Sequence, residues 1–110
     1  MRDFGYLKEK PIAVFGAGGI GKAIAADCVI AGQDVILCDI EPFAQVTLSN
    51  LDNGFRLHGD QLSRYGFRRE GTAFFNHITT NVKEGMDAAE IIIVALPAIG
   101  HSSFFKQIIP

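Results

Sequence analysis

Three glycines with the spacing G-x-G-x-x-G, at Gly16, Gly18 and Gly21, are the residues of this chain best suited to hold a charged ligand. The first allows a tight turn, the second lets a ligand approach the backbone because it has no Cβ, and the third lets a helix pack closely on a strand. The first N–H groups of such a helix lack intrahelical partners, and the helix dipole adds partial positive charge there. A diphosphate satisfies both needs. The spacing therefore predicts a site for the pyrophosphate of a dinucleotide.

An acidic residue at the end of a second apolar run completes this pattern. Asp39 follows Val35–Cys38 and comes eighteen residues after Gly21. A carboxylate at this place can accept hydrogen bonds from the ribose hydroxyls of a dinucleotide. It also repels a 2′-phosphate, and Glu41 adds negative charge, so we expect NAD(H) rather than NADP(H). The alternative is a purely structural turn, with Asp39 only ending a strand.

The glycines need a strand before them and a helix after them. The apolar run Ile12–Phe15 predicts the strand, and residues 20–31 are expected to form the helix. Gly32 follows, where a left-handed conformation ends a helix at little cost. Residues 34–38 predict a second strand whose continuous apolar character indicates burial on both faces. The expected apolar face of the helix comprises Ile20, Ala23, Ile24, Cys28 and Ala31.

The middle of the chain departs from a plain alternation of strands and helices. Pro42 suits the first turn of a second helix, which we expect to reach about Leu51. Residues 55–58 alternate with period two, Tyr65-Gly66 marks a turn, and residues 67–75 can form a second extended segment. A β-excursion is therefore predicted between the second helix and the third parallel strand.

The last part of the chain is expected to form two more strands, each followed by a helix. Asn81 can cap the first of these helices, and Ser102 or Ser103 the second. The expected bounds are 78–80 and 91–96 for the strands, the latter stopped by Pro97, and 82–89 for the first helix.

These elements predict an α/β protein with a Rossmann-type, doubly wound parallel sheet. Right-handed crossovers give the spatial strand order 3-2-1-4. We expect residues 1–10 to be a polar lead-in and residues 11–110 a dinucleotide-binding domain, truncated before strands five and six and thus the front part of a longer enzyme. The uncovered edge of strand four is a possible homodimer contact.

Composition excludes several classes of function. The chain has 110 residues, enough for one domain, and a formal net charge of −2 gives no positive field for nucleic acid. No apolar run reaches the ~18 residues of a membrane span, and the amino terminus lacks the apolar core of a signal peptide, so we expect a cytoplasmic protein. Cys28, Cys38, His58 and His77 lack the spacing of metal ligands. No metal site is predicted.

The segment Ile91–His101 contains P-A-x-x-H at its end and resembles the V-P-A-x-x-H segment of opine dehydrogenases of the octopine and nopaline type. Residues 54–59 and 78–81 are also similar to that family's excursion and third strand. The resemblance implies an intact enzyme that reduces the imine formed between a 2-oxo acid and an amino acid. It also implies that the catalytic histidine and most of the small-molecule substrate pocket belong to a C-terminal helical domain.

No residue of this chain matches that catalytic histidine, so we assign no catalytic residue. His101 is a candidate for contact with substrate or cofactor, although a histidine at a helix end is more often a hydrogen-bonding residue. Only positions for the cofactor, NAD, are carried over. They are Gly16, Ala17, Gly18, Gly19, Ile20, Gly21, Asp39, Ala95, Leu96 and Pro97.

Three alternatives remain open at this point. NAD-dependent glycerol-3-phosphate dehydrogenases resemble the chain, but usually carry Trp or Phe where Ile20 stands and P-S in place of Pro97-Ala98. Ketopantoate reductases usually place a basic residue after strand two, where this chain has Asp39-Ile40-Glu41. A nucleotide-sensing regulatory module would need no second catalytic domain. The β-excursion and the P-A-x-x-H element favour the opine dehydrogenase type.

Overall fold

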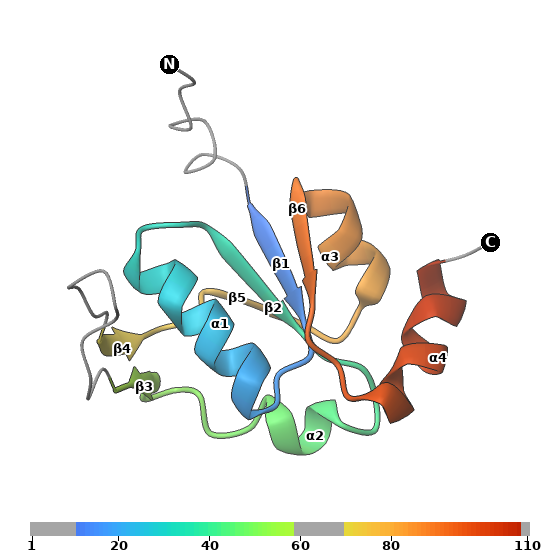
Figure 1. The fold of residues 1–110 in the computed structure, drawn as a ribbon, viewed down its shortest axis with the longest axis horizontal. Coiled ribbons are helices and arrows are strands. Elements are labelled where there is room, and N and C mark those ends of the chain that lie inside the picture. Colours follow the sequence, from blue (N-terminus) through green and yellow to red (C-terminus); the bar gives the residue numbers. More distant parts are fainter. Residues whose placement is uncertain (1–10, 59–69, 109–110) are drawn as a thin grey trace.

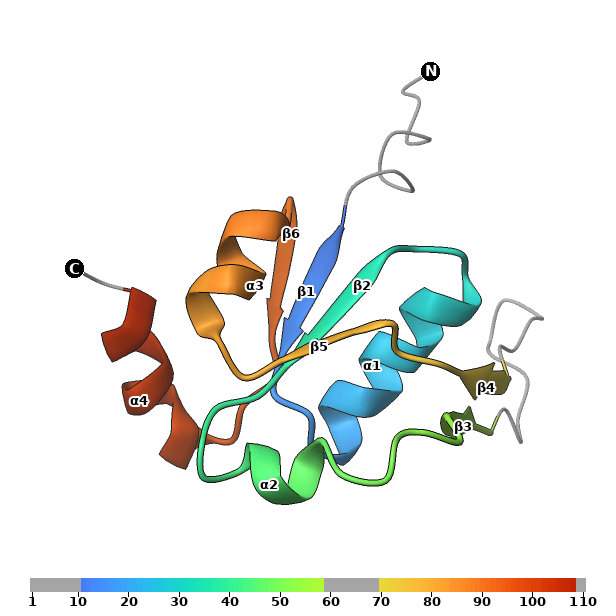
Figure 2. The same cartoon turned by 180° about the vertical axis from the view of Figure 1, so that it is seen from behind.

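The computed structural model describes residues 11–58 and 70–108. Its centre is a four-stranded parallel sheet with the order β5-β2-β1-β6. Helices cover both faces of this sheet, with α1 on one face and α3 on the other (Figures 1 and 2). The strands are β1 (Ile12–Phe15), β2 (Val35–Cys38), β5 (His77–Thr79) and β6 (Ile91–Val94). The predicted α/β class and Rossmann-like arrangement are confirmed, and the order is 3-2-1-4 when only the parallel strands are counted.

In the described part of the chain, four helices connect or follow these strands. Asn81 caps α3 as predicted, because its side-chain oxygen accepts a hydrogen bond from the Glu84 amide at 3.2 Å. Gly32 follows the end of α1 with a φ of 91°, which confirms the predicted left-handed stop. The helices are α1 (Gly19–Ile30), α2 (Ala44–Thr47), α3 (Val82–Ala88) and α4 (Ala98–Ile108).

The second helix is much shorter than predicted. The expected helix from Pro42 to about Leu51 is wrong, because α2 covers only Ala44–Thr47. Ala44 is buried but Val46 is 76% exposed, so the segment lacks a broad apolar face that would hold a longer helix. Asn50 has a φ of 58°, a left-handed conformation that a continuing α-helix excludes.

The expected start of the last helix is also wrong. Neither Ser102 nor Ser103 caps it, because α4 begins at Ala98 and both serines lie inside it. Pro97 comes directly before the helix. A proline at this end loses no intrahelical hydrogen bond, so the same residue that ends the strand segment can lead straight into a helix.

The β-excursion is an antiparallel pair of short strands, β3 (Phe55–Leu57) and β4 (Gly71–Ala73). Both contact α1 and lie beside it in Figure 1. This confirms the predicted pair of extended segments, while the expected turn at Tyr65-Gly66 and the polar lead-in at 1–10 fall outside the described residues.

Two apolar layers hold the sheet between the helices. On the α1 face, Val14 and Leu37 pack with Ala25. On the α3 face, Phe15 packs with Val82 and meets the Phe104 ring of α4 at a centroid distance of 5.0 Å. β1 is paired on both edges and buried on both faces by these two layers, as a central parallel strand requires.

Apolar side chains are exposed at two places. Ile20, predicted to lie on the packed face of the first helix, is instead 75% exposed, and α1 buries Gly21, Ala25 and Ala26. On β6, Ile92 and Val94 are exposed, and among the described residues this strand pairs only with β1. The expected contact of this edge with a second copy stays a prediction. Among the described helices, none has the length and apolar character to cross a bilayer.

Candidate functional site

The three predicted site segments are the glycine turn at 16–21, Asp39 and residues 95–97. They meet at the carboxyl edge of the sheet. Phe15 of β1 is level with Cys38 of β2 on one side and Val94 of β6 on the other, so the residues that follow them are neighbours. The Gly16 amide donates to the Cys38 carbonyl and the Ala95 amide to the Phe15 carbonyl, each at 2.7 Å. The chain leaves β1 and β6 toward opposite faces (Figure 1). This is the switch point at which ligands bind in doubly wound sheets.

Two of the three motif glycines are required by the fold itself. Gly16 has a φ of 110°, and a Cβ there would lie 2.7 Å from the backbone of Ala95. A Cβ on Gly21 would overlap the Gly16 carbonyl oxygen. These glycines therefore let the turn pack against the end of β6 and let α1 start directly against the turn.

Gly18 differs from these two glycines, because nothing among the described residues requires a glycine there. Its φ of −72° suits any residue, and no described atom lies within 4 Å of the place where its Cβ would be. The open space lies at the N-cap of α1, which no side chain caps. Gly18, Gly19 and Ile20 are all exposed there. A bare helix start beside space free of side chains fits a phosphate group.

Asp39 lies beside this turn and is 2% exposed. Its Oδ2 accepts hydrogen bonds from the Ala17 amide at 3.0 Å and from the Thr47 hydroxyl at 2.6 Å. Its Oδ1 accepts from the Ile40 amide at 2.8 Å. The carboxylate therefore joins the glycine turn, the end of β2 and α2. The place of Asp39 in the sequence was enough to predict that it lies next to the glycine turn. The structure adds that its carboxylate holds three segments together.

Sequence reasoning missed Thr47. Its hydroxyl lies within hydrogen-bond distance of Asp39 and also 3.0 Å from the Phe43 carbonyl oxygen. The contact with Asp39 depends on where the short α2 places a residue eight positions along the chain, and no spacing rule gives that. The only signal in the sequence was a hydroxyl residue soon after the acidic one.

The third predicted segment, residues 95–97, lies against the glycine turn with its backbone. The Leu96 side chain is buried in the core on the α3 face, whereas Pro97 is exposed. Nε2 of His101 lies 2.7 Å from the Leu96 carbonyl oxygen, and since a carbonyl only accepts, Nε2 carries the hydrogen. His101 thus ties α4 to the chain after β6, in agreement with the expected hydrogen-bonding role at a helix end.

The Cys38 thiol directly before Asp39 is buried. Burial raises the pKa of this thiol from 9.0 to about 12, and the negative charges of Asp39 and Glu84 add to the shift. Below pH 9 the thiol is protonated in both the folded and the unfolded protein. Between pH 9 and about 12 only the unfolded chain releases the proton, so the folded state loses stability as the pH rises.

We expect the ionisation of the Cys38 thiol to make the free energy of unfolding depend on pH more strongly in the parent than in Cys38→Ala. The free energy of unfolding should fall between pH 9 and pH 10 by about 1 kcal/mol more in the parent than in Cys38→Ala. Urea titrations of the two proteins at the two pH values measure it. Equal losses in the parent and Cys38→Ala would show that the thiol ionises alike in both states.

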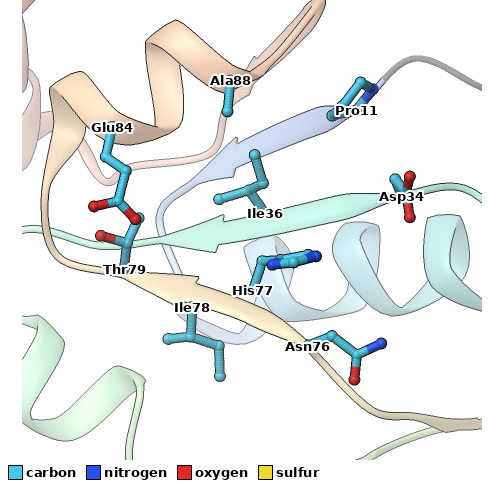
Figure 3. A pocket seen from close by; sticks show the side chains of 9 residues that line it. All are labelled: Pro11, Asp34, Ile36, Asn76, His77, Ile78, Thr79, Glu84 and Ala88. Atoms are coloured by element: carbon cyan, nitrogen blue, oxygen red, sulfur yellow. The ribbon is translucent and has the colours of Figure 1, made fainter.

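A cavity of about 410 Å³ lies elsewhere, between α3 and the β2–β5 side of the sheet (Figure 3). Asp34, His77 and Glu84 are among the residues that line it, and none of the predicted cofactor residues does. Asp34 and Pro11 precede their strands, so the cavity reaches the amino edge, opposite to the edge where parallel sheets bind ligands. Within the described residues, no group of three His, Cys, Asp or Glu side chains could hold a metal ion.

Comparison with known proteins adds one relative. No protein-family profile matches the chain. The chain is 30% identical over 102 residues to an opine dehydrogenase from Arthrobacter sp. (strain 1C). The matched region covers 93% of this chain but 26% of that enzyme, so the chain spans about a quarter of the relative's length.

Proposed function

We propose that this chain is the NAD(H)-binding domain of an oxidoreductase. The observation that carries the proposal is the open space at Gly18, which neither the backbone conformation nor any neighbouring atom of the described residues explains. This space lies at an uncapped helix start and next to a buried carboxylate. A diphosphate with an attached ribose matches both features.

Each part of the site has its own task in this proposal. The first amides of α1 bind the pyrophosphate, and the charge of Asp39 attracts a ribose hydroxyl. The backbone of Ala95 and Leu96, fixed against Gly16 and by His101, forms the wall on the other side of the switch point. The bound nicotinamide supplies the hydride chemistry, and the protein orients it. The chain's own residues bind and position, and none is proposed to transfer a proton.

The similarity to an opine dehydrogenase supports a more specific reaction. In that enzyme type, the dinucleotide would serve the reductive condensation of a 2-oxo acid with an amino acid. We propose this reaction for the whole protein, with the substrate held mainly by residues outside this chain. The resemblance of the P-A-x-x-H segment to that of opine dehydrogenases supports the same class.

Asp39→Ala tests the choice of cofactor. We expect it to weaken NADH binding and to reduce the preference for NADH over NADPH, because the charge that repels a 2′-phosphate is gone. It should also lower the free energy of unfolding by about 1–3 kcal/mol, since buried amides of Ala17 and Ile40 lose their acceptor. Calorimetric titration with both cofactors and urea unfolding measure the two effects.

Asp34→Ala is the matched control, because Asp34 precedes the same strand at its other end and its side chain is exposed. This variant should bind both cofactors as the parent does. If Asp39→Ala and the parent gave the same titration curves for NADH and NADPH, position 39 would have no part in cofactor recognition.

A further inference from the structure

The Asp39 carboxylate is already largely occupied by the protein. A carboxylate offers about four lone-pair positions to hydrogen-bond donors. Among the described residues, Oδ2 accepts two hydrogen bonds, from the Ala17 amide and the Thr47 hydroxyl, and Oδ1 accepts one, from the Ile40 amide. This leaves about one position, on Oδ1.

A ribose with both hydroxyls free would bring two donors to this carboxylate. We infer that Asp39 reads only one of the two adenosine-ribose hydroxyls, because the Thr47 hydroxyl holds the place that the other would take. This inference rests on the proposed binding of NAD(H) at this site. It makes Thr47 a specificity-determining residue. Thr47 contacts the Asp39 carboxylate and takes no part in the reaction.

The position of Thr47 supports this role. The Oγ1–Oδ2 distance of 2.6 Å is short, as expected for a hydroxyl that donates to a carboxylate. The second oxygen near the hydroxyl, the Phe43 carbonyl, is 3.0 Å away, and a hydroxyl has one hydrogen to give. Since the carboxylate is charged and closer, it takes that hydrogen. The Thr47 hydroxyl and the Ala17 amide thereby occupy Oδ2 of the buried Asp39, and the remaining position is on Oδ1.

The test compares NADH with two analogues that lack either the 2′- or the 3′-hydroxyl of the adenosine ribose. In the parent chain, we expect one analogue to bind roughly tenfold more weakly than NADH, the loss of one hydrogen bond to a charged group, and the other to bind within about twofold. In Thr47→Ala the vacated position on Oδ2 accepts the second hydroxyl, so both analogues should bind more weakly than NADH.

Two further variants complete the experiment. Thr47→Ser keeps the hydroxyl and should behave as the parent. Ser49→Ala removes an exposed hydroxyl, bonded to the Val46 carbonyl just after the same helix, and should change nothing. Each dissociation constant is measured by calorimetry.

The outcomes separate this inference from the proposed function. If the parent does not bind NADH, the proposed function fails and the inference with it. If the parent binds NADH and loses affinity for both analogues or for neither, the inference is wrong and the proposed function stands. The parent comparison decides this even if Thr47→Ala does not fold. A folded Thr47→Ala with the parent's pattern would equally contradict the role of Thr47.

Discussion

Gly18→Ala is expected to weaken NADH binding at least about tenfold while leaving the fold intact. The added methyl group would enter the space at the start of α1 that no described atom of the protein occupies. A ligand phosphate could then no longer approach the backbone amides closely. The backbone conformation at this position suits alanine, so the free energy of unfolding should change by less than about 1 kcal/mol, the scale of a helix-cap substitution.

Gly19→Ala is the matched control for this variant. It adds the same methyl group one position later, also with no atom within 4 Å, at a place where the motif accepts any residue. We expect normal NADH binding and slightly higher stability, because alanine favours a helix over glycine. Should calorimetry show equal dissociation constants for Gly18→Ala and the parent, the open space would not be the phosphate site.

Gly21→Ala is expected to have the largest effect on stability. A Cβ at this position would overlap the carbonyl oxygen of Gly16, which is backbone and cannot rotate away as a side chain can. Relieving the overlap would require α1 to move off the glycine turn and the turn to move off Ala95. We expect the free energy of unfolding to fall by at least about 3 kcal/mol, a large share of the total for a chain of this size.

Urea unfolding followed by circular dichroism measures this loss. Gly19→Ala again serves as the control, because it changes the same residue type in the same helix without any overlap. A Gly21→Ala protein within about 1 kcal/mol of the parent would contradict the close packing of the turn and the helix.

The parallel sheet, and the meeting of the predicted site segments at its carboxyl edge, were predictable because their signals are local. The glycine spacing specifies a strand, a turn and a helix within ten residues, and continuous apolar runs mark the buried strands β1 and β2. Asn81 was recognised because an N-cap bonds to an amide three residues later. Crossover handedness then fixed the order of the strands.

Other features depend on packing that the sequence does not display. The length of α2 depends on how little of it is buried, and the start of α4 depends on Pro97 leading directly into the helix. Ile20 fits a helical apolar pattern, yet it lies in the exposed first turn, where no neighbouring element covers it. The Thr47–Asp39 contact joins two elements whose relative placement only the tertiary fold determines.

The central claim is that a dinucleotide binds at the carboxyl edge of the sheet, and amide chemical-shift mapping with NADH tests it most directly. The account predicts that the largest shifts occur at the amides of residues 16–21, at Asp39 and Ile40, and at Ala95. Shifts gathered instead around Asp34, His77 and Glu84 would place the ligand in the cavity beneath α3. That result, or the absence of any shift at saturating NADH, would contradict the account.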